Sequence, residues 1–390
     1  MSPDLPPKPR LGTALGYLTA TRLLVNTLHR FVFPFLPAIA RGLGISLGQA
    51  GLLVSARNLA GAAAPLTVGV GSRGGGRRVV VAGLVLLVVG AALASVSAGL
   101  IAALVAFVLL GLGKPTFDVG QQTYLSDRTP YHLRARYLST VELTWAGGLL
   151  LGGPAAGWLI SRFGWQAPFV AVGIGLAVAL ALAQRVLEPG PPRPSGRRAT
   201  LELEPAARSL LAVALLFSLA TELVFIVFGA WLEEDFGLSL IGLGGVATVI
   251  GLAELAGEGT TIAFTDRLGK RRAVAIGLVI SIVSFAALGA ASGRFGIGIA
   301  LLAIGLFGFE ITIVSTIPLA SEVDPADRSR YLALLVVAVS IGRAAGAGIG
   351  PWLFERSGFA ANTLVAAALL VAALATLLRW VPEPDHARPA

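Results

Sequence analysis

SRGGGRR at residues 72–78 recurs as DRLGKRR at residues 266–272, a shift of 194 residues without a gap. Three further pairs of segments align at this shift or at one of 193 residues: RARYL (134–138) with RSRYL (328–332), GWLISRFGW (157–165) with PWLFERSGF (351–359), and LGISL (43–47) with FGLSL (236–240). The chain is therefore predicted to hold two copies of one unit, at residues 1–187 and 209–390. The proline-rich residues 188–208 are predicted to link them.

The composition is that of a membrane protein. Of the 390 residues, 55% are hydrophobic and 13% charged, and the mean hydropathy is +0.81, whereas soluble domains contain about 25% charged residues. Apolar stretches of about 20 residues, enough to span a bilayer, occur twelve times, at roughly 12–40, 48–70, 79–97, 100–125, 137–160, 165–187, 209–232, 240–264, 273–292, 297–320, 331–354 and 359–381. We predict an all-α integral membrane protein with two parallel six-helix repeats.

The basic residues predict the orientation in the membrane. Of 30 Lys and Arg, 21 lie on the termini and even-numbered loops, five lie within the apolar stretches, and four lie on odd-numbered loops: Arg41, Arg162, Arg294 and Arg356. This asymmetry places both termini in the cytoplasm of a bacterial inner-membrane protein. The net charge of +9 is thereby explained without a nucleic-acid partner.

Motifs typical of soluble enzymes occur in the wrong context. The G-x-G-x-x-G pattern at Gly69, Gly71 and Gly74 has no strand before it and is followed by an uncharged apolar stretch, unlike a dinucleotide-binding turn. Neither Lys114 nor Lys270 is followed by Ser or Thr, which excludes a P-loop. Cysteine is absent and the three histidines are scattered. We expect no enzyme activity, no metal site and no cofactor, with energy supplied by the proton motive force.

Two motifs resemble those of a known family. TDRLGKRR at residues 265–272 resembles the major facilitator signature loop D-R-x-G-R-[KR], and GGPAAG at 152–157 resembles the Gly-Pro motif of proton-coupled exporters. Two positions depart from the family pattern. Ser72 replaces the Asp of the first signature copy, and Phe107 stands where many drug exporters have an Arg. The resemblance implies that helices 1, 4, 7 and 10 line a cavity and that helices 2, 5, 8 and 11 form the interface between the halves.

The resemblance also implies a cytoplasmic gate formed by the signature loops. Asp266 is expected to contact Arg134 and Arg136 at the start of helix 5, while Ser72 faces Arg328 and Arg330 and offers no charge. The gate candidates are Ser72, Arg73, Gly75, Arg77, Asp266, Arg267, Gly269, Arg271, Arg134, Arg136, Arg328 and Arg330.

Charged residues within the apolar stretches are the candidates for function, because each costs at least about 2.5–3.5 kcal/mol at mid-bilayer. None lies in helices 3, 6, 9 or 12. The proton-coupling candidates are Glu222, Glu310, Asp118, Glu142, Glu254 and Glu258. The substrate-cavity candidates are Arg22, Asn26, His29, Arg30, Lys114 and Arg343, and Arg57 is the interface candidate.

Several of these charges have a structural alternative. Lys114 and Asp118 are four residues apart, which favours an internal ion pair. Glu222 and Glu310 have no cation on their own helices, and each either couples protons or forms a static salt bridge to helix 1 or Arg343. Glu142 and Glu258 are predicted at one depth on neighbouring helices, near Glu254, so we expect a bound proton or a shared Arg there.

The sequence therefore predicts a monomeric secondary active transporter that moves a small organic or amphipathic solute by alternating access. Proton-coupled export is favoured by the Gly-Pro motif and the intramembrane acids. A lipid or lysolipid flippase and a proton-coupled uptake symporter remain alternatives, and a non-transporting receptor is disfavoured because the chain has no large cytoplasmic domain. The sequence identifies neither the subfamily nor the substrate.

Overall fold

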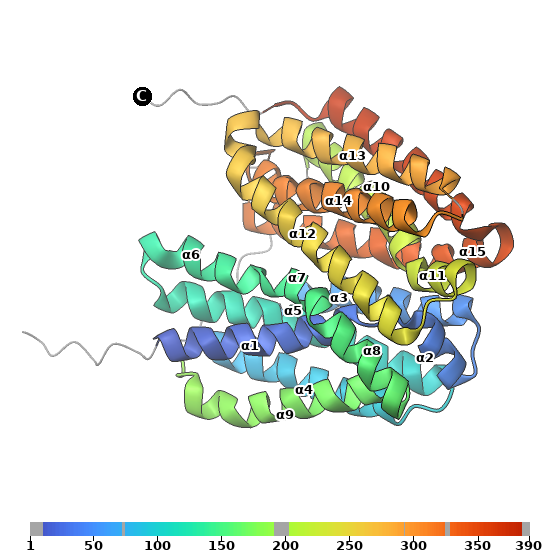
Figure 1. The fold of residues 1–390 in the computed structure, drawn as a ribbon. Helices are drawn as coiled ribbons and strands as arrows, with labels where there is room; N and C mark the ends of the chain where they lie inside the picture. Colours follow the sequence, from blue (N-terminus) through green and yellow to red (C-terminus); the bar gives the residue numbers. More distant parts are fainter. Residues whose placement is uncertain (1–10, 72–74, 191–202, 292, 324–327, 384–390) are drawn as a thin grey trace, which may run out of the picture.

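The computed structural model describes residues 11–71, 75–190, 203–291, 293–323 and 328–383. These ranges are mostly helical and contain no β-strand. The helices of the first repeat, shown in Figure 1, are α1 (Leu11–Arg30), α2 (Leu36–Leu43), α3 (Leu47–Gly71), α4 (Gly75–Ser95), α5 (Leu100–Arg128), α6 (Tyr131–Glu142), α7 (Thr144–Leu150), α8 (Gly152–Phe163) and α9 (Ala167–Val186). Those of the second are α10 (Pro205–Phe225), α11 (Phe228–Phe236), α12 (Leu240–Leu268), α13 (Lys270–Ala290), α14 (Phe295–Val323) and α15 (Arg328–Trp380).

The described helices confirm an all-α membrane fold. Nine helical segments are long and apolar enough to cross a membrane, two of which combine neighbouring helices (Thr140–Phe163 and Pro205–Phe236), or ten if the bent pair α2 and α3 forms one span. α15 is interrupted at Gly358, whose φ of 72° is not helical. Twelve spans remain a prediction, since this count covers only the part of the chain that is described.

The helices pack into two bundles that meet along two lines. α4 packs on α5 and α9 in the first bundle, and α13 packs on α14 and α15 in the second. The bundles meet where α3 packs on α15 and where α12 crosses α7 and α8 (Figure 1). Most of the predicted linker, residues 191–202, lies outside the described residues.

Repeat-related glycines allow close approach of helix backbones. A Cβ added at Gly83 would lie 2.5 Å from the backbone nitrogen of Phe117, and one at Gly277 would lie 2.6 Å from the carbonyl oxygen of Gly308. Gly83 and Gly277 occupy the same position in the two repeats. Small residues at helix contacts are typical of membrane bundles and account for part of the glycine content.

Two predicted spans are broken at equivalent positions. The stretch 12–40 forms α1 and α2, which are separated around Pro34, and the stretch 209–232 forms α10 and α11, which are separated at Ile226 and Val227. Pro34 has no N–H to donate to the carbonyl of Arg30, which instead accepts a bond from Phe33 at 3.2 Å. The breaks pack against each other across the two halves, since a Cβ at Gly229 would lie 2.2 Å from the Pro34 carbonyl oxygen.

The predicted span 137–160 is also not one helix but parts of α6, α7 and α8. Its second break, at Leu151, precedes Pro154 of the Gly-Pro motif. Proline cannot donate a hydrogen bond to the carbonyl four residues earlier, and here the Thr248 hydroxyl of α12 donates to the Leu150 carbonyl at 3.2 Å. The motif thus places the break of α7 and α8 directly against the other half.

Candidate functional site

Arg22 organises the polar residues of the first half. Its guanidinium donates to both carboxylate oxygens of Glu142 at 2.7 and 2.8 Å, and its Nε lies 3.4 Å from Asp118. Lys114 donates to Asp118 at 2.6 Å, which confirms the ion pair that their spacing predicts. Helices α1, α5 and α6 are therefore held together by two cations and two carboxylates.

A buried ion pair joins the two halves. Arg30 on α1 donates to both oxygens of Glu254 on α12 at 2.6 Å, and the side chains are 1% and 3% exposed. The Arg30 guanidinium also donates to the Trp145 carbonyl at 2.9 Å and lies 4.2 Å from the centre of the Trp145 ring. Bidentate geometry and a second acceptor compensate the cost of burying these charges.

Glu222 and Glu310 have different environments. Arg343 donates to Glu222 at 2.9 Å, so the salt-bridge alternative describes Glu222 in this conformation. Glu310 is buried on α14 beside α12, where a Cβ at Gly257 would lie 2.9 Å from its own Cβ. The described residues provide no hydrogen-bond partner for Oε2 of Glu310. Glu310 is thus close to the pair that joins the halves, with one carboxylate oxygen that none of the described residues satisfies.

The predicted acidic cluster surrounds a shared cation. Glu258 interacts electrostatically with Glu142, Arg22 and Glu254, and Arg22 in turn is paired with Glu142. Arg22 is therefore a cation shared by Glu142 and Glu258, whereas Glu254 is bound by Arg30.

Several of these residues line a cavity between the two halves. About 630 Å³ of space, including its part open to solvent, is lined by His29, Arg57, Asn58, Gly61, Gly111, Lys114, Pro115, Asp118, Trp145, Val336, Val339, Ser340 and Arg343. A second space of about 300 Å³ shares Trp145 and Arg343 with it and is lined also by Arg30, Ser218, Thr221, Glu222, Phe225, Glu254, Leu306 and Phe309. Of the substrate-cavity candidates, Arg22 and Asn26 are not among these lining residues, and Asn26 donates to Thr144 at 3.0 Å.

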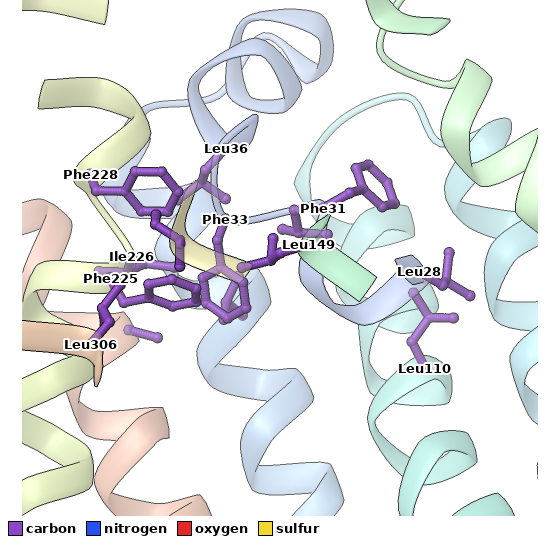
Figure 2. Close-up of a cluster of buried hydrophobic side chains, with 14 of the residues drawn as sticks. Leu28, Phe31, Phe33, Leu36, Leu110, Leu149, Phe225, Ile226, Phe228 and Leu306 are labelled. Carbon is purple, nitrogen blue, oxygen red and sulfur yellow. The ribbon is translucent and has the colours of Figure 1, made fainter. Parts of the chain in front are cut away.

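Aromatic side chains at the helix breaks gather beside this cavity, and Figure 2 shows Phe33, Phe225 and Phe228 close together. The rings of Phe33 and Phe225 lie 4.5 Å apart across the two halves, and Phe228 stacks on Phe225 at 5.3 Å. We call Phe33, Phe225 and Phe228 the aromatic plug. Arg57 lies 5.3 Å and Arg343 5.7 Å from the Phe33 ring, so the plug lies directly against the charged cavity.

Further contacts close the same side, opposite to the start of α1. Arg41 on α2 forms an ion pair with Glu233 on α11 at 2.8 Å, and the Gly48 backbone donates to Glu355 at 3.2 Å. On the side of the chain termini, α6 packs against α1, α5 and α7 of its own half, and in Figure 1 it diverges from the end of α12.

The signature loops contain a glycine with left-handed backbone in each repeat. Gly75 has φ of 74° and Gly269 of 89°, values that other residues adopt only with strain. Arg271 donates to the Leu378 carbonyl at 2.7 Å and thereby fixes α13 to the end of α15. Arg77 is half-buried, and Arg267 and Arg328 are exposed.

The predicted contacts of the gate fall on residues that are not described. Ser72 and Arg73 lie outside the described residues, as do the side chains of Asp266, Arg134 and Arg136. Arg330 is half-buried and has interactions within the described chain. The gate remains a prediction.

The aromatic residues of the site were absent from the candidates that the sequence supplied. Trp145 lies between Arg30 and Lys114, at 4.2 and 5.3 Å from their charged groups, and the plug residues Phe33 and Phe225 meet only in the tertiary structure. An aromatic residue in an apolar stretch carries no local sign of a functional role. The sequence indicates only one of the two helix breaks beside the plug, through Pro34. The equivalent residue in the second repeat, Val227, gives no such indication.

Comparisons with known proteins identify the family. The model of the Major Facilitator Superfamily matches residues 18–257 and 210–390. An uncharacterized MFS-type transporter, YbcL of Bacillus subtilis (strain 168), is 23% identical over 95% of this chain and 96% of its own. The multidrug resistance protein MdtH of Cronobacter sakazakii (strain ATCC BAA-894) is 29% identical over 28% of each chain.

Solved structures show the same fold. The crystal structure of a bacterial homolog to the human lysosomal transporter Spinster, in an inward-facing and unoccupied conformation, has a TM-score of 0.76 at 17% identity and covers 97% of this chain and 100% of that one. The D-xylose-proton symporter has a TM-score of 0.78 at 16% identity, over 96% and 98% of the two chains. With its repeats, its intramembrane charges and these similarities, the chain belongs to the major facilitator superfamily and is a transporter, not an enzyme.

Proposed function

We propose that this transporter is a proton-coupled secondary carrier that exports a small organic or amphipathic solute by alternating access. The observation that carries the proposal is the charged cavity between the halves, closed on one side by the aromatic plug, together with Glu310, a buried acid outside the described ion pairs that lies near the Arg30–Glu254 pair. The proposed setting is the bacterial cytoplasmic membrane, with both termini in the cytoplasm and the protein as a monomer.

Alternating access requires that the cavity be closed on one side at a time. With cytoplasmic termini, the closed side with Arg41, Glu233 and the aromatic plug is external, and this conformation faces inward. The solute then enters from the cytoplasm or the inner leaflet. Outward opening would separate Phe33 from Phe225 and bring the signature loops together with the opposite half.

Glu310 connects proton binding to the contact between the halves. Its charged neighbours include Glu254 and Arg30, the pair that joins the two halves. An ionised Glu310 would place a second carboxylate near the cation that Glu254 already binds, whereas a protonated Glu310 leaves that pair undisturbed. Release of the proton on one side of the membrane would therefore weaken the contact between α1 and α12 and favour the other conformation.

Transport in proteoliposomes tests this proposal. Vesicles with an entrapped pH indicator are exposed to a panel of organic solutes, and the proton flux that each solute induces is recorded. For a solute that gives flux, Glu310→Gln is expected to abolish transport driven by a pH gradient but to retain solute counterflow, because exchange needs no proton release. Glu204→Gln, an exposed acid at the start of α10, is the matched control.

Undiminished gradient-driven transport in Glu310→Gln would contradict the proposed role of Glu310. The sign of the flux also separates export from uptake. If solute leaves vesicles of known orientation while protons enter, the carrier is an antiporter. If solute and protons move in the same direction, it is a symporter and the export proposal is wrong.

A further inference from the structure

Arg57 is a buried cation with unused hydrogen-bond donors. It is 1% exposed and lines the larger cavity. Its Nη1 donates to the His29 carbonyl at 2.8 Å, but Nε and Nη2 have no partner among the described residues. The neighbouring Asn58, 7% exposed and lining the same cavity, likewise has an unpartnered Nδ2. Buried donors without partners are costly, so this wall of the cavity is built to receive an acceptor.

Among the described residues, the ion pairs around the cavity leave Arg57 without a carboxylate of its own. The cations Arg22 and Lys114 are balanced by Asp118 and Glu142, Arg30 by Glu254, and Arg343 by Glu222. The charged groups acting on Arg57 are Glu222, already bound by Arg343, and Arg343 itself. Two cations therefore share one carboxylate at this wall, which favours an anionic ligand.

An apolar space adjoins the same wall. About 430 Å³ is lined by Phe217, Ile313, Thr316, Ile317, Leu335, Val336, Val339 and Ser340. Val336, Val339 and Ser340 line this space and the charged cavity alike. A single molecule can therefore contact the Arg57 wall with one end and the apolar space with the other.

On the basis of the proposed transport function, we infer that the substrate is an amphipathic organic anion. Its carboxylate, phosphate or sulfate group binds Arg57 and Asn58, and its hydrocarbon part lies against Val339 and Phe217. Guanidinium binds such oxyanions through two parallel hydrogen bonds, and Nε and Nη2 are the pair of donors that Arg57 has free. The apolar part contributes affinity through burial.

Binding to the purified protein in phosphatidylcholine nanodiscs, measured by calorimetry without a pH gradient, tests the inference. The probes are hexyl phosphate and hexyltrimethylammonium, which have the same tail and opposite charge, with empty nanodiscs as the blank. Hexyl phosphate is expected to bind at least tenfold more tightly. Equal affinity, or preference for the cation, in the wild-type protein would overturn the inference without recourse to any variant.

Variants then assign the two ends of the ligand. Arg57→Gln is expected to weaken the binding of hexyl phosphate by about tenfold or more, which corresponds to about 1.4 kcal/mol. Arg57→Lys is expected to retain part of that affinity. Arg162→Gln, at an exposed arginine outside the cavity, serves as the control and should bind normally. Unchanged affinity in a folded Arg57→Gln protein would refute the assignment.

The length of the alkyl chain tests the apolar space. From inorganic phosphate through butyl to hexyl phosphate, affinity is expected to rise by up to about fourfold per methylene, since burying one CH₂ contributes about 0.8 kcal/mol. Leu335→Phe, at a residue that lines the apolar space but not the charged cavity, should flatten this dependence while leaving the binding of inorganic phosphate unaffected. Affinity that does not depend on chain length in the wild-type protein would remove the apolar part of the inference.

Competition identifies the source of the anion. If lysophosphatidate displaces hexyl phosphate from the nanodisc-bound protein more strongly than soluble aryl phosphates do, the substrate is a membrane lipid. The reverse order indicates a soluble metabolite.

Because these binding measurements use no pH gradient, they are independent of proton coupling. Failure of Glu310 as the coupling residue leaves the binding result intact, and failure of anion binding leaves the coupling test intact.

Discussion

Removing one partner of the Arg30–Glu254 pair is the sharpest test of how the two halves are held together. Arg30→Met leaves the Glu254 carboxylate 3% exposed and without its cation. Breaking a buried pair in this way costs about 3–5 kcal/mol, whereas replacing both partners by apolar residues removes the uncompensated charge. The double variant Arg30→Met/Glu254→Met loses mainly the contacts of Arg30 with Trp145, which are a hydrogen bond from a charged donor (about 1.5–3 kcal/mol) and a cation–π contact (about 0.5–2 kcal/mol), and Arg30→Met loses the same contacts.

The double variant is therefore expected to be more stable than Arg30→Met by up to about 3–5 kcal/mol, the cost of the uncompensated Glu254 charge. Unfolding in mixed micelles with increasing dodecyl sulfate, followed by tryptophan fluorescence, measures the three variants against the wild type. The control is Arg41→Met, whose pair with Glu233 is 59% exposed on the Arg side and should contribute about 0–1 kcal/mol. Destabilisation of the double variant equal to the sum of the two single variants would refute the electrostatic account.

Three further predictions concern conformation and packing. Arg41→Gln should increase the outward-open population, because it removes an ion pair from the closed side. Spin-label distances between α2 and α11 would reveal this shift, and unchanged distances would exclude a role of Arg41 in closing that side. Asp266→Asn should shift the carrier toward inward-open more than Ser72→Ala, because a charged hydrogen bond contributes about 1.5–3 kcal/mol and a neutral one about 1; equal effects in spin-label distances across the cytoplasmic ends would contradict the gate. Gly342→Ala should destabilise by about 1–3 kcal/mol, since its Cβ would lie 2.3 Å from a carbonyl oxygen of α10, whereas Gly245→Ala has open space; similar melting temperatures would disprove the packing argument.

The membrane class and the internal repeat are both readable from the amino-acid sequence. Long apolar stretches and the distribution of Arg and Lys are local features, and their cost in a bilayer does not depend on which helices become neighbours. The same reasoning identifies the charged residues of the cavity, because a charge such as Arg30 or Glu254 within a membrane span requires a specific partner. The Lys114–Asp118 pair is predictable because both residues lie on one helix, one turn apart.

Which charges pair across helices, and which stay unpaired, depends on the tertiary structure. Glu222 and Glu310 look alike in the sequence, yet Glu222 binds Arg343, whereas Glu310 lies beside the Arg30–Glu254 pair and is in none of the ion pairs of the described residues. That difference depends on how helices far apart in the chain rotate and cross, which the periodicity of a single helix does not encode. The aromatic plug also depends on the tertiary structure. Phe33 and Phe225 close the cavity only because two equivalent helix breaks, 193 residues apart in the chain, pack against each other.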